Sequence, residues 1–239
     1  MNLIEVEDLH VRYGAYEAVK GVSFTLGKGE ILGIVGESGS GKSTIAKTLM
    51  GLEKCSSGTI TLKPCNPGTL KPSLQMIFQD AVGSLNPRMT VRQTLSEVLK
   101  IKQSNNPNNR TPERLLDLVG LSSAILDQYP REMSGGQCQR VSIARALACE
   151  PEVLIADEPV SALDVSVQAR ILNLLRDLRR DLGLSILLIA HDLAVVKNVC
   201  DRICVMEHGL FVDSGDAKEV FDHPTSEYTK RLLSAVPRI

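Results

Sequence analysis

The sequence predicts an α/β fold built around a parallel β-sheet, and two observations support this. After Pro151, apolar runs of strand length alternate with longer runs of helical periodicity, a pattern typical of parallel sheets. Residues 36–44, GESGSGKST, form a glycine-rich loop between an apolar run and a helical run. We expect one domain, with an α/β core in residues 1–80 and 151–217, a helical insertion in 81–150 and a helical tail in 218–239.

The N-terminal segments predict antiparallel strands ahead of the parallel core. Residues 3–11 alternate apolar and polar side chains, and residues 18–26 do so more loosely, as half-buried strands do. The continuously apolar residues 31–35 predict a buried strand, and residues 45–50 predict a helix.

The loop between that strand and helix matches the pattern G-x-x-x-x-G-K-[ST] and predicts a nucleoside triphosphate site. Its glycines let backbone N–H groups converge on a phosphate, and the helix N-terminus adds partial positive charge. We expect Lys42 to reach the terminal phosphates and Ser43 to ligate Mg²⁺. The remaining residues of the expected ATP-binding loop are Gly36, Glu37, Ser38, Gly39, Ser40, Gly41 and Thr44.

The middle of the chain turns from strands to helices. Residues 59–62 and 74–78 are strand candidates, and residues 91–147 are mainly helical, interrupted by an asparagine-rich linker at 105–109. Thr111, Pro112 and Glu113 offer an N-cap, a proline at the first helical position and an early acidic residue.

The C-terminal half supplies the remaining sheet and two adjacent carboxylates. We expect strands at 153–156 and 185–190, helices at 165–182 and 193–199, and a closing hairpin of 202–206 with 210–214. Asp157 and Glu158 follow an apolar strand whose C-terminal end faces the ligand crevice of a parallel sheet. Asp157 is placed to hold Mg²⁺, and Glu158 to polarise the attacking water. An acidic N-cap would explain one carboxylate but not both.

Three further features gain meaning only beside the phosphate loop. Residues 134–137 (Ser134, Gly135, Gly136 and Gln137) begin a helix and offer a second anion site, although Ser-Gly-Gly is also an ordinary turn and cap. Gln79 and His191 follow strands, where they could contact metal, water or γ-phosphate, or simply be solvated loop residues. Tyr13 either stacks on a base or merely ends a strand.

Composition limits the other classes of function. The net charge of −1 argues against a broad nucleic-acid-binding face, and neither a signal peptide nor a membrane span is visible in the sequence. The six cysteines are scattered and lack metal-ligand spacing, so we expect packing or surface roles. They are Cys55, Cys65, Cys138, Cys149, Cys200 and Cys204.

These motifs, in this order, resemble the ATP-binding subunit of an ATP-binding-cassette (ABC) transporter, which has a P-loop NTPase fold with a RecA-like core. The loop at 36–44 is similar to Walker A and residues 153–158 to Walker B. Gln79 resembles the glutamine-loop residue, residues 134–137 the signature motif, residues 161–164 the D-loop, and His191 the switch histidine. The resemblance implies ATP and Mg²⁺ as ligands, with metal contacts from Ser43, Gln79 and Asp157 and catalytic roles for Glu158, His191 and Gln79.

A narrower resemblance, carried by residues 83–91, 165–169 and 223–237, is to the oligopeptide, dipeptide and nickel importers. It implies an ATPase at the cytoplasmic face of the membrane, bound to permease subunits and paired with a second, non-identical ATPase. An extracytoplasmic solute-binding protein would take part indirectly. The solute stays open among peptides, nickel and a metal chelate, with the short stretch after Pro237 tilting the expectation toward nickel or a chelate.

Two other functions remain as alternatives. One is a soluble ABC ATPase of a multi-enzyme complex, such as the phosphonate carbon–phosphorus lyase. The other is a regulatory nucleotide-binding subunit without turnover, which the presence of both Glu158 and His191 argues against.

Overall fold

The computed structural model describes residues 1–64, 71–102, 111–161 and 163–234. A six-stranded sheet in the order β5-β6-β7-β3-β8-β9 forms its centre. All neighbouring pairs in this sheet are parallel except the hairpin of β8 and β9. The strands are β3 Ile31–Val35, β5 Leu74–Ile77, β6 Val153–Asp157, β7 Ser185–Ala190, β8 Arg202–Glu207 and β9 Leu210–Asp216.

The central strands are continuously apolar because both faces of the sheet are covered. In β3, Ile31 and Val35 face one hydrophobic cluster, whereas Leu32 and Ile34 face another. Every residue of β3, β6 and β7 is buried. This two-sided burial is the reason that these strands show no alternation of apolar and polar residues.

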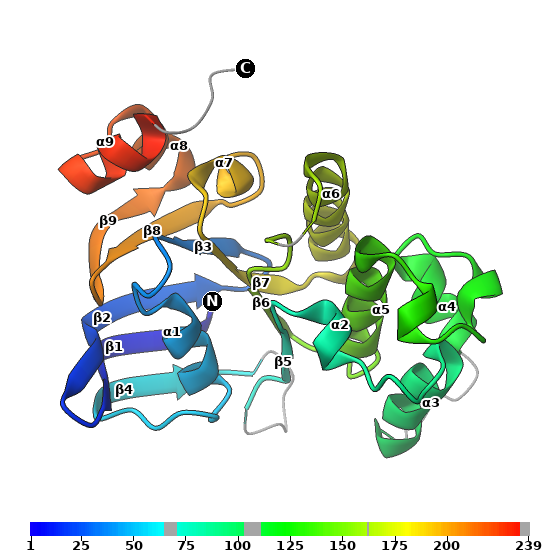
Figure 1. Ribbon diagram of the computed structural model, residues 1–239. Helices are drawn as coiled ribbons and strands as arrows, with labels where there is room; N and C mark the ends of the chain where they lie inside the picture. The colour runs from blue at the N-terminus through cyan, green and yellow to red at the C-terminus, as the bar shows by residue number, and fades with distance from the viewer. Residues whose placement is uncertain (65–70, 103–110, 162, 235–239) are drawn as a thin grey trace.

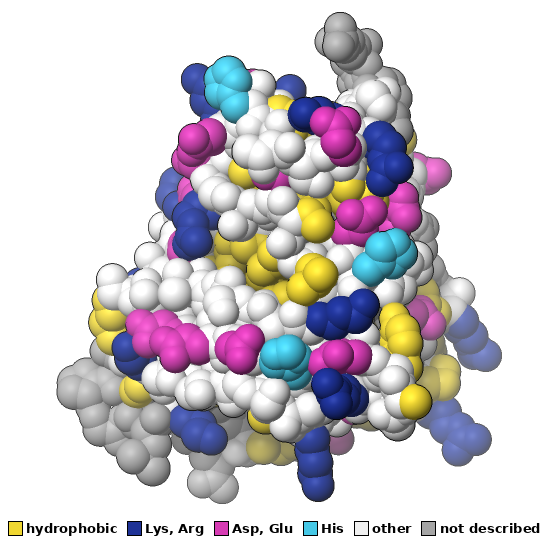
Figure 2. All heavy atoms as spheres, turned by 90° about the vertical axis from the view of Figure 1, so that its left-hand side faces the viewer, with side chains coloured by type: hydrophobic (Ala, Val, Ile, Leu, Met, Phe, Trp, Pro, Cys, Tyr) yellow, Lys and Arg dark blue, Asp and Glu magenta, His cyan; other side chains and the backbone are white. Residues whose placement is uncertain are grey.

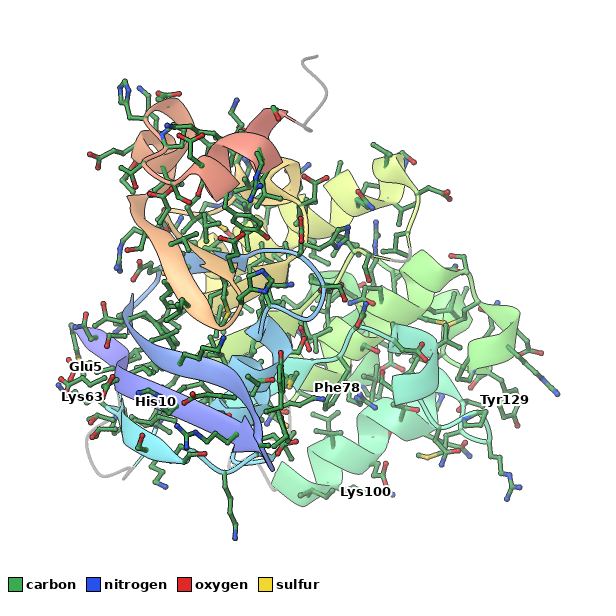
Figure 3. The ribbon with its side chains drawn as sticks, turned by 60° about the vertical axis from the view of Figure 1, so that its left-hand side comes forward. Glu5, His10, Lys63, Phe78, Lys100 and Tyr129 are labelled. Atoms are coloured by element: carbon green, nitrogen blue, oxygen red, sulfur yellow. The ribbon has the colours of Figure 1, made fainter. Side chains whose placement is uncertain are left out.

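One face of the central sheet packs against a second sheet and the helix α1 Lys42–Leu49. The second sheet has the order β2-β1-β4, with β1 Asn2–Tyr13, β2 Tyr16–Gly27 and β4 Ser57–Leu62. Its pairings are antiparallel, as the alternation at the N-terminus predicts. Glu5 of β1 and Lys63, which follows β4, lie side by side (Figure 3), with Lys63 Nζ and Glu5 Oε2 2.6 Å apart.

The helices between β5 and β6 gather at one end of the molecule, away from the second sheet (Figure 1). Thr111 caps α4 by accepting a hydrogen bond from the backbone N–H of Arg114, with Pro112 at the first turn, as the sequence predicts. The elements are α2 Ala81–Ser84, α3 Val91–Lys102, α4 Pro112–Leu118, α5 Gly135–Leu147 and the 3₁₀ turns η2 Ser123–Ile125 and η3 Pro130–Glu132. The division into core, insertion and tail stays a prediction.

The C-terminal part supplies α6 Val165–Leu182, α7 Leu193–Val196, α8 Ala217–Asp222 and α9 Glu227–Ser234. The expected helix 193–199 is too long, because α7 ends at Val196. Beyond it, the N–H groups of Val199 and Cys200 both donate to the Val196 carbonyl, and Asp201 then donates to Ile31. This tight turn brings the chain into β8 beside β3. Cys65, the linker 105–109, Ala162 and residues 235–239 lie outside the described residues.

Side chains of both charges are scattered over the face formed by β1, β2 and β9, with uncharged surface between them (Figure 2). Of the cysteines that the structure describes, Cys55 is exposed, Cys149 is partly buried, and Cys138, Cys200 and Cys204 are buried.

Among the described helices, none combines the length and apolar character needed to cross a bilayer.

Candidate functional site

The loop between β3 and α1 is held so tightly by neighbouring backbone that two of its positions admit only glycine. A side chain at Gly36 would collide with the carbonyl oxygen of Met206, and one at Gly41 with that of Ala18. Gly41 also has a φ of 112°, which side chains rarely adopt. It is the N-cap of α1 and makes no side-chain cap, so the first N–H groups of the helix are left for an anion.

Lys42 carries the positive charge of this loop in a buried position. Its side chain is 3% exposed, and its ammonium donates to the carbonyls of Gly36 and Glu37 at 2.7 and 2.8 Å. Burial lowers the pKa of Lys42, and the carboxylate of Glu158, 3.8 Å away, opposes the shift. A buried cation held by two carbonyls is suited to receive a phosphate group.

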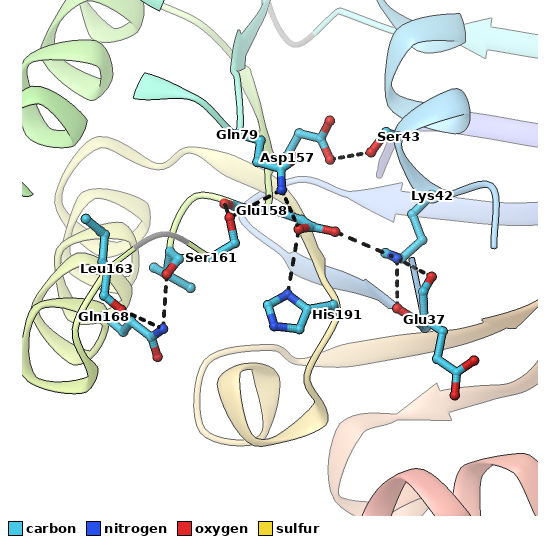
Figure 4. A network of polar contacts seen from close by, with 12 residues as sticks. Glu37, Lys42, Ser43, Gln79, Asp157, Glu158, Ser161, Leu163, Gln168 and His191 are labelled. Carbon is cyan, nitrogen blue, oxygen red and sulfur yellow. Dashed lines mark hydrogen bonds and ion pairs between the residues drawn. The ribbon is translucent and has the colours of Figure 1, made fainter. Parts of the chain in front are cut away.

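Ser43 and Asp157 form an oxygen pair beside the loop. The Ser43 hydroxyl donates to Asp157 Oδ1 at 2.9 Å (Figure 4). Asp157 is 5% exposed, and burial raises the pKa of its carboxyl group. Hydroxyl and carboxylate oxygens are the ligands that Mg²⁺ prefers, and a cation would offset the desolvation of Asp157. These residues therefore fit a magnesium ion.

Glu158 lies where the contacts of several elements meet. Its Oε2 accepts a hydrogen bond from Gln79 Nε2 at 3.0 Å and lies 3.6 Å from His191 Nδ1 (Figure 4). Its backbone is left-handed, with a φ of 46°, and its N–H donates to Ile189 of β7. Such backbone conformations cost free energy and cluster at functional sites. This one lies at the end of β6, where it turns the carboxylate toward Lys42.

A cavity of about 290 Å³ opens in front of these groups. It brings together residues from the β1–β2 hairpin, the phosphate loop, the end of β5 and the end of β6. Its lining comprises Tyr13, Tyr16, Ala18, Ser38, Gly39, Gly41, Lys42, Ser43, Thr44, Gln79 and Glu158. Of the expected residues outside this lining, Gly36, Glu37 and Ser40 belong to the same loop, while Asp157 and His191 contact lining residues.

The other expected group, residues 134–137, does not line this cavity. In the single chain, Ser134 and Gln137 form a capping box at the start of α5. The Ser134 hydroxyl accepts from Gln137 N at 3.3 Å, and Gln137 Oε1 accepts from Ser134 N at 2.8 Å. Gly135 and Gly136 occupy the first turn of α5, where helix N–H groups lack intrahelical acceptors. These residues form a helix start apart from the phosphate loop.

Sequence reasoning missed two aromatic residues at this site. Tyr16 pairs with Tyr13 across the end of the β1–β2 hairpin and also lines the cavity. The repeated tyrosine around Gly14 is a local signal that could have revealed it. Tyr228 of α9 accepts a hydrogen bond from the backbone N–H of Glu37 at 2.9 Å. This contact joins residues 191 positions apart, and no local pattern marks it.

The arrangement can bind and cleave a phosphoanhydride. The loop N–H groups and Lys42 can neutralise phosphate charge, and Ser43 with Asp157 can hold a divalent cation. The Glu158 carboxylate lies at the cavity wall, where it can accept a proton from an attacking water.

Comparisons with known proteins agree with this geometry. A family model described as "ABC transporter" matches residues 19–161. The oligopeptide transport ATP-binding protein OppF of Lactococcus lactis (strain IL1403) is 48% identical over 232 residues, which cover 93% of this chain and 73% of that protein. OppF of Escherichia coli K12 is 44% identical, with 98% of this chain and 78% of that protein covered.

A solved ATP-binding cassette, described as the dimeric structure of a post-hydrolysis state bound to ADP and Pi, superimposes with a TM-score of 0.76. It is 26% identical, and the match covers 90% of this chain and 98% of that one. The family match over more than half of the sequence, together with these relatives, shows that this chain belongs to the ABC transporter family, as one of its ATP-hydrolysing subunits.

Proposed function

We propose that this chain drives the transport of oligopeptides by binding and hydrolysing ATP beside integral membrane permease subunits. The observation that carries the proposal is the convergence of Lys42, Ser43 and Glu158 on one cavity in a chain 48% identical to an oligopeptide transport ATP-binding protein. The names of the relatives favour peptides over nickel or a metal chelate, and transport over service in a soluble multi-enzyme complex.

Each element of the cavity has a distinct role in this proposal. Tyr13 stacks on the adenine base, with Tyr16 beside it. The loop amides and Lys42 bind the phosphates. Glu158 positions and deprotonates the attacking water, while Gln79 and His191 hold the Glu158 carboxylate and contact the γ-phosphate side of the cavity.

Magnesium would be held by Ser43 and Asp157, with Gln79 at the neighbouring edge. When bound, this ion neutralises charge on the phosphate oxygens. The 2.9 Å contact between Ser43 and Asp157 supports this assignment, because it shows that both oxygens reach a common point.

The position of residues 134–137 supports a composite site between two ATPase subunits. These residues lie outside the chain's own cavity, and the related cassette was solved as a dimer. In the proposed assembly, Ser134 and the amides of Gly135 and Gly136 close over ATP held by the partner. The partner is a second, non-identical ATPase, and both lie at the cytoplasmic face of the membrane. The permease and an extracytoplasmic binding protein select the solute.

The test is reconstitution of the chain with its permease and partner ATPase in vesicles. We expect uptake of a labelled oligopeptide that requires both ATP and Mg²⁺ and is lost with EDTA. A parallel assay with nickel and a nickel chelate serves as the control. ATP-dependent uptake of nickel but not of peptides would contradict the proposed solute, while leaving the ATPase role intact.

A further inference from the structure

The C-terminal helix α9 contacts the phosphate loop directly through one buried side chain. The Tyr228 hydroxyl accepts a hydrogen bond from the Glu37 N–H at 2.9 Å, and Tyr228 is only 5% exposed. Buried tyrosine hydroxyls are usually hydrogen-bonded, but their partners need not be functional. Here the partner is the second residue of the loop that surrounds Lys42.

The amide that Tyr228 holds belongs to the same peptide plane as the carbonyl that holds Lys42. The N–H of Glu37 and the carbonyl of Gly36 lie at opposite ends of one rigid peptide unit. The Gly36 carbonyl accepts from Lys42 Nζ at 2.7 Å. The next carbonyl, that of Glu37, accepts from Lys42 Nζ at 2.8 Å and from Ser40 N at 3.2 Å. Fixing the Gly36–Glu37 peptide therefore fixes one of the two carbonyls that hold the Lys42 ammonium.

Tyr228 is itself held in place by the segment before α9. Asp213 of β9 accepts hydrogen bonds from the Thr225 hydroxyl and from Ser226 N, the latter at 2.9 Å. The Ser226 hydroxyl in turn accepts from Tyr228 N at 3.2 Å. The tyrosine is thus positioned by hydrogen bonds that lead through Ser226 to Asp213 of β9.

A second link ties α9 to the hairpin that supports the other side of the loop. Arg231 lies over the Tyr228 ring, 5.9 Å from its centroid, and its guanidinium is 3.5 Å from Glu207 of β8. In the turn after Glu207, Gly209 N donates to the Ser40 carbonyl at 3.0 Å. The hairpin and α9 therefore contact the phosphate loop at two separate residues, Ser40 and Glu37.

The hydroxyl is also suited to a site for anions. A tyrosine hydroxyl is neutral at neutral pH and burial raises the pKa of Tyr228 further, so the group brings no negative charge toward bound phosphates.

We propose that Tyr228 is a positioning residue for ATP binding: its hydroxyl orients the Gly36–Glu37 peptide and thereby the resting place of Lys42. The inference rests on the nucleotide-binding role proposed above for the loop. It makes the tail helix part of the nucleotide site, although α9 contributes no residue to the cavity lining.

The test is Tyr228→Phe, which keeps the buried ring and removes only the hydroxyl. Affinity for a fluorescent ATP analogue is measured on the full chain with Mg²⁺, and KM and kcat for ATP in the transporter complex. We expect affinity to weaken about three- to tenfold, as for loss of one hydrogen bond, and KM to rise while kcat changes less than twofold. The control is Tyr129→Phe. It removes the same hydroxyl oxygen from a tyrosine that lies among the helices between β5 and β6, away from the phosphate loop (Figure 3).

A merely structural role predicts a different pattern. Loss of folded protein would lower kcat and the melting temperature together, without changing KM, and that result would overturn the inference. Unchanged affinity and KM in Tyr228→Phe, beside a wild-type chain that binds the analogue, would also overturn it. Failure of the wild-type chain to bind the analogue would instead contradict the nucleotide-binding role of the loop, and the inference with it.

Discussion

At the scale of single residues, three side chains surround the Glu158 carboxylate. Gln79 and His191 reach it from the ends of two different strands, and Lys42 lies 3.8 Å from its other oxygen. These three contacts orient the side chain. A fixed orientation suits the general-base role proposed for Glu158, because geometry decides which proton a base can accept.

Glu158→Gln should abolish turnover and preserve ATP binding. The amide keeps the shape of the carboxylate but cannot accept a proton, while the Lys42 and Ser43 contacts remain. We expect kcat to fall by at least about a hundredfold, with the affinity for ATP changed less than threefold. Steady-state hydrolysis and equilibrium binding, measured on the same preparation, give the two quantities. Near-wild-type hydrolysis would remove Glu158 from the catalytic role.

Lys42→Ala should weaken ATP binding itself, because it removes the proposed direct charge contact to phosphate. We expect ATP affinity to fall at least about tenfold, as measured by calorimetric titration with Mg²⁺ present. Lys47→Ala is the matched control, since it removes an exposed lysine from the same helix. Equal losses in the two variants would mean that the general charge of α1 matters, and not the position of Lys42.

How much of the site the sequence predicts depends on how local each contact is. Lys42 and Ser43 are found from the spacing of the loop residues, and Asp157 from its position at the end of an apolar strand, because these signals lie within short stretches of sequence. The contact of Tyr228 with Glu37 is not predictable in this way, since it depends on how the tail packs after the sheet has formed. The left-handed backbone of Glu158 has no signal either, as glutamate rarely adopts it.

At the scale of elements, α5 and α6 approach closely where Gly136 of α5 faces Val167 of α6. A side chain at Gly136 would begin 2.6 Å from Val167 Cγ1, and one at Gly135 would begin 3.4 Å from Leu163 Cδ2. The start of α5, which carries residues 134–137, is therefore packed on the segment that follows Glu158.

Gly136→Ala should destabilise the chain through this contact. The added methyl group forces the branched Val167 side chain or the helix to move, at a cost of about 1–3 kcal/mol in the free energy of unfolding. Urea unfolding of the full chain measures it. Adding Val167→Ala removes the opposing methyl groups, and the double variant should recover most of the loss. If the second substitution restores nothing, the clash is not the cause.

Elements were predictable where one physical signal dominates. Strands β6 and β7 follow from apolar runs, because both of their faces are buried. Helix α6 ends at Leu182, as expected, since Gly183 adopts a φ of 67° as its C-cap. Helix α7 ends three residues before the expected Val199, because tertiary hydrogen bonds to β3 draw the chain away. The helix propensities of residues 193–199 contain no information about these contacts with a strand distant in sequence.

At the scale of the whole molecule, the chain has two separate surfaces, and the proposed mechanism requires both of them to contact the same ATP. The cavity lies between the β1–β2 hairpin and the ends of β5 and β6, whereas residues 134–137 lie at the start of α5. One chain therefore carries one of each. In the proposed assembly, a head-to-tail pair would supply both surfaces to each ATP, and bound nucleotide would form much of the interface.

The final prediction is that this chain works beside a second, non-identical ATPase. Alone and without ATP it should be mostly monomeric, because each proposed interface depends on phosphate-bridged contacts. Mixed with the second subunit and ATP, it should form a 1:1 heterodimer with faster hydrolysis, which light scattering and an ATPase assay would detect. Glu158→Gln in this chain should stabilise the pair by blocking the hydrolysis that releases it. A fully active homodimer, from a cell encoding no second ATPase for this transporter, would contradict the heterodimer and leave the composite site unchanged.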